Sequence, residues 1–378
     1  MRTELQEMHE PIRVLHCVAG LGRGGYETFI MNVYRHIDRT RVQFDFLYSF
    51  DGVFAQEIQS LGGRTFQIPF ITQKGPFVYR KAVRDFLKSH GEYKIVHSHM
   101  DKFSGLIMEC AKEQGIPVRI AHSHSTRNEG GLAFQLVKDY YGKKVLPNCT
   151  DKMACSDEAY QWMFGTRENM QVVKNGIDTE KFTNQDNRNK ALFTVVNVGR
   201  FAQSKNHEFL IEVFQELYRL DNTARLVLAG TGALLEKTRE MVQARGLSGA
   251  VTFLEDCDDV AKLLTTADVV CMPSLFEGLP VSLVEAQSAG VPCVISDRIP
   301  AEANITGTVT FLSLEDSPQK WAEELLKHKH QKKPDNRQKL VDAGYDIRHT
   351  AKVLQDFYLS KGGEISGNAA GIGNCTHI

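Results

Sequence analysis

Short apolar runs alternate with longer segments of helical periodicity along most of this chain. The runs are rich in Val, Ile, Leu and Phe, as is typical of strands that are buried on both faces of a parallel sheet. The segments between them repeat apolar residues at three- and four-residue spacings and predict amphipathic helices. This order predicts two doubly wound α/β sheets that face each other across a cleft. The predicted strands cover residues 13–19, 43–49, 65–68, 95–98, 118–122 and 152–155, then 192–198, 225–229, 251–254, 269–272 and 291–295.

At 378 residues the chain exceeds what one hydrophobic core usually supports, so two domains are expected. The Asn175–Gly176 turn signal, followed by the polar segment 184–190, indicates the linker. We place one domain at 1–168 and the other at 169–346. Helical periodicity over 347–360 predicts a terminal helix, and the glycine-rich stretch 361–378 predicts a flexible tail.

Composition narrows the function classes. A net charge of −1 gives no general reason to expect nucleic-acid binding. No apolar run approaches the roughly 20 residues that span a bilayer, and the first eleven residues are too polar for a secretory signal, so we expect a cytoplasmic protein. The eight cysteines include no C-x-x-C pair and share no metal-ligand spacing with histidine, which argues against structural disulfides and zinc.

Residues 274–297 carry the first candidate chemistry. An apolar run ends at Pro273, a loop contains Glu277, and a helix that begins near Pro280 contains Glu285. Free N–H groups at a helix N-terminus attract phosphate, and a carboxylate nearby can accept hydrogen bonds from sugar hydroxyls. The segment therefore predicts a sugar nucleotide, with one carboxylate for each sugar. Taken alone, it is more typical of a capped surface helix with two solvated acids.

Arg200 and Lys205 supply cations at the end of the second half's first strand. A guanidinium fork and a compact ammonium suit two adjacent phosphates. If a sugar–diphosphate bond breaks, such cations stabilise the charge that develops on the leaving group without a metal. They lie at the strand-end edge that also carries Glu277 and Glu285, which favours a site over an ordinary surface loop.

A glycine-rich loop follows the first strand. Gly20, Gly22 and Gly25 satisfy G-x-G-x-x-G between a strand and a helix. A nicotinamide enzyme would require an acid at the end of the second strand, but Asp45 lies inside that strand. The loop fits better as a place where a ligand approaches the backbone closely.

Two histidine pairs end neighbouring strands of the first half, where doubly wound sheets bind ligands. A purely structural role remains open for them, and no third ligand with suitable spacing indicates a metal. The basic residues that follow could bind an anionic acceptor or a membrane surface, or form a solvated helix face. The pairs are His97 with His99 and His122 with His124, and the basic residues are Arg127, Lys138, Lys143 and Lys144.

Several segments resemble the retaining GT-B glycosyltransferases of family 4. Three lie in the second half: NVGRFAQSKNHEFLIEVF, LAGTGALLEKTREMVQARGL and SLFEGLPVSLVEAQSAGVPCVISD. GLGRGGYETFIMNV and NGIDTEKF match the family's glycine loop and interdomain turn, and the resemblance covers about residues 12–360. VRIAHSHS is most similar to members that build bacterial capsular polysaccharide or exopolysaccharide.

The resemblance implies roles for the second-half residues. Arg200 and Lys205 would hold the donor diphosphate, together with backbone N–H groups. Glu285 would bind the ribose and Glu277 the hydroxyls of the transferred sugar. The backbone groups belong to Gly278 and Leu279.

It also implies roles for the first half. Gly24 and Gly25 would let this domain close on the diphosphate, and the terminal helix would return to it. His122 and His124 are both candidates for the active-site histidine, and His122 is preferred. Glu255 is a candidate contact to the base.

A metal is not expected at the Asp-x-Asp sequence that follows Glu255. Residues 256–258 resemble the metal motif of another transferase fold, but they fall in the loop near the base in this family.

We therefore predict a metal-independent hexosyltransferase without a cofactor. It would move a sugar from a nucleotide diphosphate, most simply a UDP-sugar, to a saccharide or lipid-linked saccharide with retained configuration. It would work in the cytoplasm or at the inner face of the membrane. The alternatives are a nucleotide-sugar epimerase on the same fold, an NAD-dependent oxidoreductase and a sugar-nucleotide sensor without catalysis.

Overall fold

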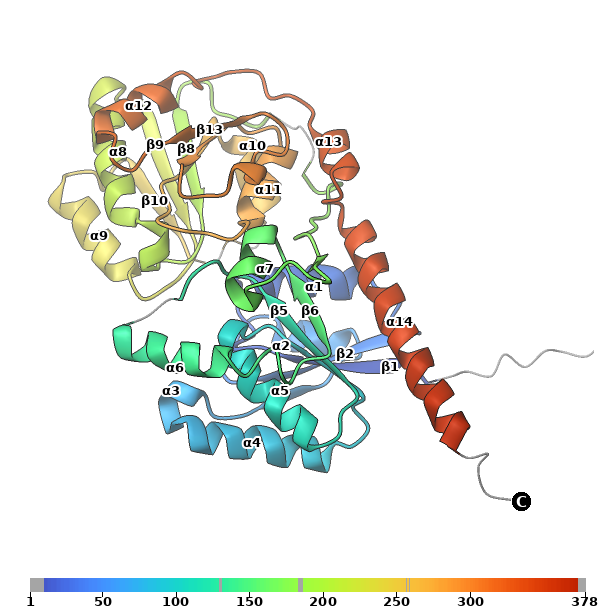
Figure 1. Cartoon of the computed structure of the whole chain (residues 1–378). Coiled ribbons are helices and arrows are strands. Elements are labelled where there is room, and N and C mark those ends of the chain that lie inside the picture. The colour runs from blue at the N-terminus through green and yellow to red at the C-terminus, as the bar shows by residue number, and fades with distance from the viewer. Residues whose placement is uncertain (1–9, 129–130, 183–185, 256, 258, 373–378) are drawn as a thin grey trace, which may run out of the picture. The chain divides into compact units, whose positions relative to one another are not determined.

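The computed structural model describes residues 10–128, 131–182, 186–255, 257 and 259–372 (Figure 1). The chain divides into two compact units. Unit 1 runs to Lys174 and resumes at Arg348, and unit 2 comprises Asn175–Ile347. Both units are parallel α/β sheets, which confirms the predicted fold class. No helix in the described part of the chain is long and apolar enough to cross a membrane.

The sheet of unit 1 has seven strands in the order β3-β2-β1-β4-β5-β6-β7, and all its pairs are parallel. The order reverses at β1, whose neighbours are β2 and β4, and such a reversal is where ligands bind in doubly wound sheets. The strands are β1 (Ile12–Cys17), β2 (Val42–Tyr48), β3 (Thr65–Gln67), β4 (Ile95–Ser98), β5 (Val118–Ser123), β6 (Asp151–Ala154) and β7 (Gln171–Val172).

Helices connect these strands, and their positions agree closely with the periodic segments of the sequence. They are α1 (Gly25–His36), α2 (Ala55–Ser60), α3 (Ile71–Lys74), α4 (Pro76–Ser89), α5 (Ser104–Glu113), α6 (Leu132–Gly142) and α7 (Asp157–Phe164), with a 3-10 turn η1 (Asp101–Phe103).

The carboxylate of Asp45 lies inside the sheet of unit 1 and is fully buried. Arg13 and Arg64 both pair with it, at 2.6 and 2.8 Å, and the hydroxyl of Tyr93 donates to it at 2.8 Å. Although burial raises the pKa of Asp45, hydrogen bonds from these three side chains hold it below the usual value. Asp45 therefore stabilises the sheet and is not available to bind a ribose, which removes the acid that an NAD-binding site would need.

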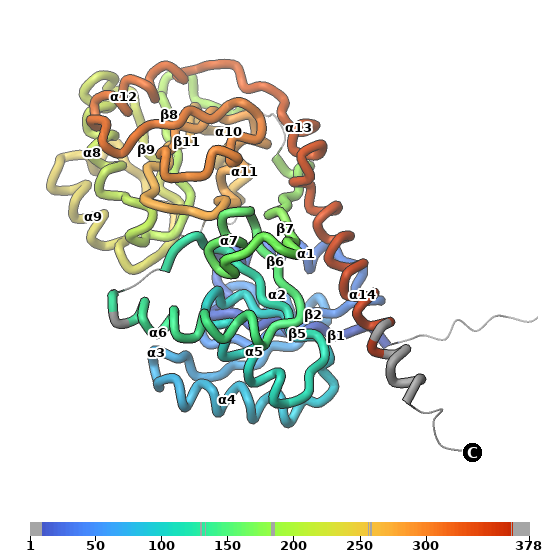
Figure 2. Tube along the Cα trace, in the orientation of Figure 1, coloured from blue at the N-terminus to red at the C-terminus, as the bar shows by residue number. Residues whose placement is uncertain are grey.

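Helix α14 (Ile347–Ile372) packs on unit 1, although it follows unit 2 in sequence (Figure 2). Leu354 and Tyr358 are buried, and Lys361 pairs with Asp151 at 3.2 Å. The helix is longer than the sequence predicts. It continues to Ile372, inside the region expected to be a tail, and the Lys361–Asp151 ion pair is a contact past Ser360; residues 373–378 of that region lie outside the described residues.

The sheet of unit 2 has six parallel strands in the order β10-β9-β8-β11-β12-β13. Its last strand was not predicted, because β13 is a short edge strand that is mostly half-buried and has a weak apolar signal. The strands are β8 (Phe193–Val198), β9 (Ala224–Ala229), β10 (Val251–Leu254), β11 (Val269–Met272), β12 (Cys293–Ser296) and β13 (Val309–Leu312).

Apolar side chains pack on both faces of this sheet. Phe214 and Trp321 belong to one buried cluster, and Leu283 and Ile295 belong to the other. The helices are α8 (His207–Leu220), α9 (Leu235–Ala244), α10 (Val260–Thr266), α11 (Val281–Ser288), α12 (Pro318–Leu326) and α13 (Arg337–Asp342), with 3-10 turns η2 (Gln203–Lys205) and η3 (Ala301–Ala303).

Candidate functional site

The loop after β8 carries Arg200 at the carboxyl edge of the unit 2 sheet. Its backbone is fixed by hydrogen bonds from Gly199 N–H to Ala229 O (2.9 Å) and from Phe201 N–H to Thr231 O (2.8 Å). Gly230, at φ +140°, packs so closely that a Cβ there would lie 2.1 Å from Gly199 O. The exposed side chain of Arg200 has no hydrogen bond or ion pair with any residue that the structure describes. A rigid loop thus presents an unengaged guanidinium.

Lys205 lies in η2 and points back over this loop. Its Nζ is 2.5 Å from Oε1 of Glu277, and each side chain is less than 15% exposed. A Cβ on Gly199 would lie 2.9 Å from Cε of Lys205, so the lysine side chain packs directly over this glycine. The structure therefore brings together the cation and the acid that the sequence placed on separate loops.

The loop before α11 is fastened to its surroundings by three hydrogen bonds. Leu275 N–H donates to Ser204 O at 2.7 Å, Asn175 Nδ2 donates to Leu279 O at 2.9 Å, and Ser282 Oγ donates to Val198 O at 3.1 Å. Sequence reasoning missed the bond from Asn175, because an Asn–Gly pair indicates a turn and not the distant carbonyl that its side chain reaches.

Backbone donors are left open at the start of α11. The N–H groups of Gly278 and Leu279 have no acceptor among the described residues. The helix cap, Pro280, makes no side-chain hydrogen bond to the helix. Because the first N–H groups of a helix attract anions, this end of α11 is suited to phosphate.

Glu285 lies within α11 and is only 9% exposed. Its carboxyl has no hydrogen-bond partner among the residues that the structure describes, and burial raises its pKa to about 7. A buried carboxyl without donors is costly to the fold. This arrangement fits a ligand that supplies hydroxyl groups.

Glu255 lies apart from this group of contacts. Its exposed carboxylate pairs with Arg239, which lies in α9. The aspartates of the Asp-x-Asp sequence, Asp256 and Asp258, lie outside the described residues.

In unit 1 the glycine loop begins α1. Gly24 is the residue before the helix and Gly25 its first residue. A Cβ on Gly24 would lie 2.1 Å from Oε2 of Glu27, whereas no atom lies within 4 Å of a Cβ on Gly25. The carboxylate of Glu27 therefore lies against the loop at the N-terminus of α1, where a bound anion would meet it.

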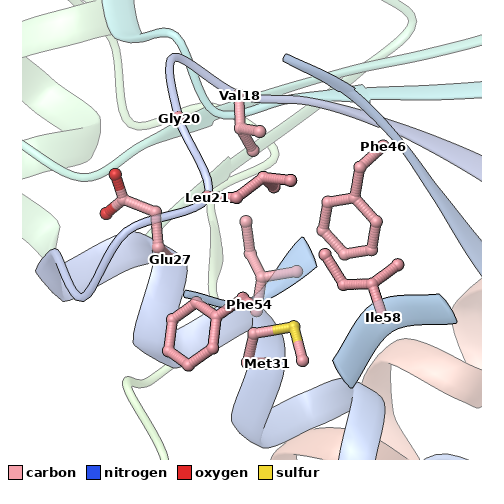
Figure 3. A pocket seen from close by; sticks show the side chains of 9 residues that line it. Val18, Gly20, Leu21, Glu27, Met31, Phe46, Phe54 and Ile58 are labelled. Carbon is pink, nitrogen blue, oxygen red and sulfur yellow. The ribbon is translucent and has the colours of Figure 1, made fainter. Parts of the chain in front are cut away.

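A small apolar pocket lies beside this loop (Figure 3). Leu21, Phe46 and Phe54 form its walls, and Glu27 is its charged side chain. The carboxylate oxygens of Glu27 point away from the apolar side chains (Figure 3). The pocket is therefore part of the core behind the glycine loop and offers little polar recognition.

The two predicted histidine pairs belong to a cluster of five. His16, in β1, is the fifth member, and it stands opposite His97 in the β1–β4 register. Sequence reasoning missed it, because a single histidine inside an apolar strand carries no local signal. His16, His97 and His122 are at most 2% exposed, while His124 is partly exposed.

The rings form two hydrogen-bonded series. In the first, Tyr358 Oη lies 2.7 Å from Nδ1 of His97, whose Nε2 lies 3.1 Å from Nδ1 of His122. In the second, Nδ1 of His16 lies 3.0 Å from Nε2 of His99, whose Nδ1 lies 2.8 Å from Nε2 of His124.

Burial disfavours the charged form of these histidines. Burial lowers the pKa of His16 and His124 to about 3. Burial, followed by repulsion from neighbouring histidines, holds the pKa values of His97, His99 and His122 well below the ordinary value.

Two trios of this cluster bring nitrogens within 4.8 Å of one another: His16, His97 and His99, and His99, His122 and His124. Each trio contains a stacked pair, His97–His99 at 4.2 Å or His122–His124 at 4.1 Å between ring centroids. Lone pairs lie in the ring planes, so two stacked rings do not direct them at one ion. The geometry favours hydrogen bonding over metal coordination.

Two family models match this chain. The model described as Glycosyltransferase Family 4 matches residues 23–181, and the model described as Glycosyl transferases group 1 matches residues 178–346.

Relatives extend the match over nearly the whole chain. The putative glycosyltransferase EpsF of Bacillus subtilis (strain 168) is 36% identical, over 92% of this chain and 96% of its own length. The capsular polysaccharide biosynthesis glycosyltransferase CapH of Staphylococcus aureus is 23% identical, over 93% of this chain and 99% of its own. The crystal structure of Anabaena HepE in complex with UDP-glucose superposes with a TM-score of 0.74 at 17% identity, covering 92% of this chain and 99% of HepE.

Proposed function

This chain is a GT-B glycosyltransferase that belongs to glycosyltransferase family 4, and we propose that it transfers a sugar from a UDP-sugar to an acceptor hydroxyl with retained configuration. The proposal rests on the carboxyl edge of the unit 2 sheet. There Arg200 and Lys205 follow β8, while Glu277, paired with Lys205, and the buried Glu285 follow the neighbouring strand β11. Similarity to HepE, whose crystal structure contains UDP-glucose, supports uracil as the base.

The charges of this edge suit a diphosphate leaving group. When the bond between the anomeric carbon and the phosphate oxygen breaks, its electron pair remains on the diphosphate. Arg200, Lys205 and the N–H groups of Gly278 and Leu279 would stabilise that charge as it develops. Glu285 would accept hydrogen bonds from the ribose, and we retain Glu255 only as a candidate contact to the base.

Glu277 would position the transferred sugar. Nζ of Lys205 lies 2.5 Å from its carboxylate. This ion pair orients the carboxylate and makes it a weaker nucleophile. The configuration at the anomeric carbon is then retained if the acceptor oxygen attacks the same face of the sugar that the diphosphate leaves. The proton of the acceptor passes to the departing phosphate oxygen, so the charges balance without a protein nucleophile. In unit 1, His122 or His124 would hydrogen-bond the donor, and Gly24 and Gly25 would approach the diphosphate.

We place the reaction in capsular polysaccharide or exopolysaccharide assembly, with a saccharide or lipid-linked saccharide as acceptor. Similarity to CapH supports this setting. An epimerase would instead need an acid–base pair that acts on the sugar of the donor alone.

Metal-independent transfer is the first testable consequence. Because two cations and backbone N–H groups can stabilise the leaving diphosphate, we expect UDP release from a UDP-sugar to require an acceptor and to persist in EDTA. A screen of nucleotide sugars, with release of the nucleotide measured by chromatography, tests this. Activity that EDTA abolishes and Mn²⁺ restores would overturn the metal independence. Rapid formation of an isomeric nucleotide sugar without acceptor would identify an epimerase.

Replacing Arg200 should slow transfer. Because the guanidinium would stabilise the charge that grows on the diphosphate as its bond to the sugar breaks, we expect Arg200→Ala to lower kcat about a hundredfold or more. Arg219→Ala, which removes an exposed guanidinium of the same unit, is the control. Steady-state kinetics of both variants decide the matter, and near-normal turnover in Arg200→Ala would disprove the assignment.

Glu285 should make donor binding depend on pH. In the protein without a ligand the pKa of the Glu285 carboxyl is about 7, and ribose hydroxyls form better hydrogen bonds with its ionised form. Binding therefore favours loss of the proton, and affinity for UDP should rise from about pH 6 to about pH 8. In Glu285→Gln the affinity should be at least about tenfold weaker at the higher pH. Calorimetry on both proteins isolates this contribution, because ionisation of UDP itself affects them equally. Identical pH profiles would exclude Glu285 from the site.

We also propose that unit 1 attaches peripherally to an anionic membrane through α6. Leu132, Leu136 and Tyr140 follow at four-residue intervals on one face of this helix and are 81%, 71% and 58% exposed. Arg127 and Lys143, which flank the helix, are also exposed. An exposed apolar stripe beside basic residues is the pattern of helices that lie in the membrane interface.

Vesicle sedimentation tests this attachment. We expect the protein to sediment with phosphatidylglycerol vesicles and to do so far less when Leu132 and Leu136 are both changed to Ser. Leu220→Ser, which removes an exposed leucine of unit 2, should have no effect. Equal sedimentation of all three proteins, or none with the unaltered protein, would refute the role of α6.

A further inference from the structure

The first histidine series begins at a helix far away in the sequence. Tyr358 belongs to α14, and its hydroxyl contacts Nδ1 of His97 at 2.7 Å. Both side chains are fully buried. The small void beside them has no space for a water molecule, and apolar side chains such as Leu354 line it together with His16 and His99. Among the described residues, His97 is therefore the hydrogen-bond partner of this hydroxyl.

The direction of this hydrogen bond follows from counting donors. Burial raises the pKa of Tyr358, so the hydroxyl keeps its proton. If the hydroxyl donates to His97 Nδ1, then His97 carries its proton on Nε2 and donates to His122 Nδ1. His122 must then carry its proton on Nε2. One buried donor, Nε2–H of His122, is left without a partner among the described residues.

The opposite direction satisfies fewer groups. If His97 donated to the hydroxyl, the phenolic O–H would have no acceptor and Nε2 of His122 would have no donor. Two buried groups would then be unsatisfied, and each costs about 1–3 kcal/mol. Imidazole nitrogen is also a better acceptor than a phenolic oxygen. The arrangement with the fewest unsatisfied groups is the one in which Tyr358 donates.

We propose that Tyr358 is a positioning residue, which acts through His97 to keep the proton of His122 on Nε2 and so makes His122 a hydrogen-bond donor to an oxygen of a bound ligand. The second series has no such anchor, because both its ends, Nε2 of His16 and Nδ1 of His124, lack partners in the described part of the chain. The two candidate histidines therefore differ: the tautomer of His122 is set by the fold, while a ligand is free to set that of His124. The role toward a ligand rests on the proposed function, but the tautomer does not.

The experiment measures the tautomer directly in the full chain. Labelling with ¹⁵N-histidine distinguishes protonated from unprotonated ring nitrogens by their shifts, and the His122→Gln variant assigns the signals. We expect neutral His122 with its proton on Nε2 in the unaltered protein. In Tyr358→Phe, which removes only the hydroxyl, the signals of His122 should move toward a mixture of both tautomers. Tyr160→Phe removes another fully buried hydroxyl, one that donates to Glu168 O at 3.0 Å, and should leave His122 unchanged.

Three results would overturn the proposal: a proton on Nδ1 of His122, an unchanged His122 in a folded Tyr358→Phe, or signals that show a bound metal. In the transfer assay, we expect Tyr358→Phe to lower kcat by up to about tenfold with unchanged affinity for UDP. Unchanged kcat would overturn the contribution to catalysis. If the unaltered protein transferred no sugar, the proposed function would fail while the tautomer measurement still stood, so the two failures are distinguishable. The measurement on the unaltered protein decides the tautomer even if the variant does not fold.

Discussion

The parallel pairing of the strands constrains where the loops of this chain lie more than any single contact does. In unit 2 every described strand pair is parallel, so the loops that follow β8, β9 and β11 all emerge at one edge of the sheet. Glu277 is far from Arg200 and Lys205 in sequence, yet these loops carry all three residues to that edge. The loops hold one another through backbone hydrogen bonds, such as Phe201 N–H to Thr231 O. Backbone contacts therefore fix the loops that carry these charges.

The site residues that sequence reasoning proposed are those with a local signal. Arg200, Lys205 and Glu277 follow apolar runs that end abruptly, and a polar residue at such a place is readily recognised. Most strands and helices were predicted for the same reason, since alternation of apolar runs and helical periodicity is a local property. The fold class of both units followed from that alternation alone.

What sequence reasoning missed depends on register between distant segments. His16 has no signal inside β1 until the β1–β4 pairing sets it opposite His97. Asn175 reaches the carbonyl of Leu279, and Tyr358 reaches His97, across separations that no sequence pattern encodes. The length of α14 was underestimated because glycines near residue 362 indicate a break, whereas packing against unit 1 sustains the helix.

The neutral histidines of unit 1 also bear on the chemistry. The pKa values of all five histidines lie below the ordinary value, at about 3 for His16 and His124, so their charged form is disfavoured at neutral pH. A buried imidazole of this kind can orient a ligand by hydrogen bonding, but it is a poor general base because protonation would place a charge in an apolar stack. In unit 2, Glu277 is paired with Lys205, and Glu285 is buried within α11. None of these described side chains is well suited to take the proton of an acceptor, which supports the proposal that the departing phosphate takes it.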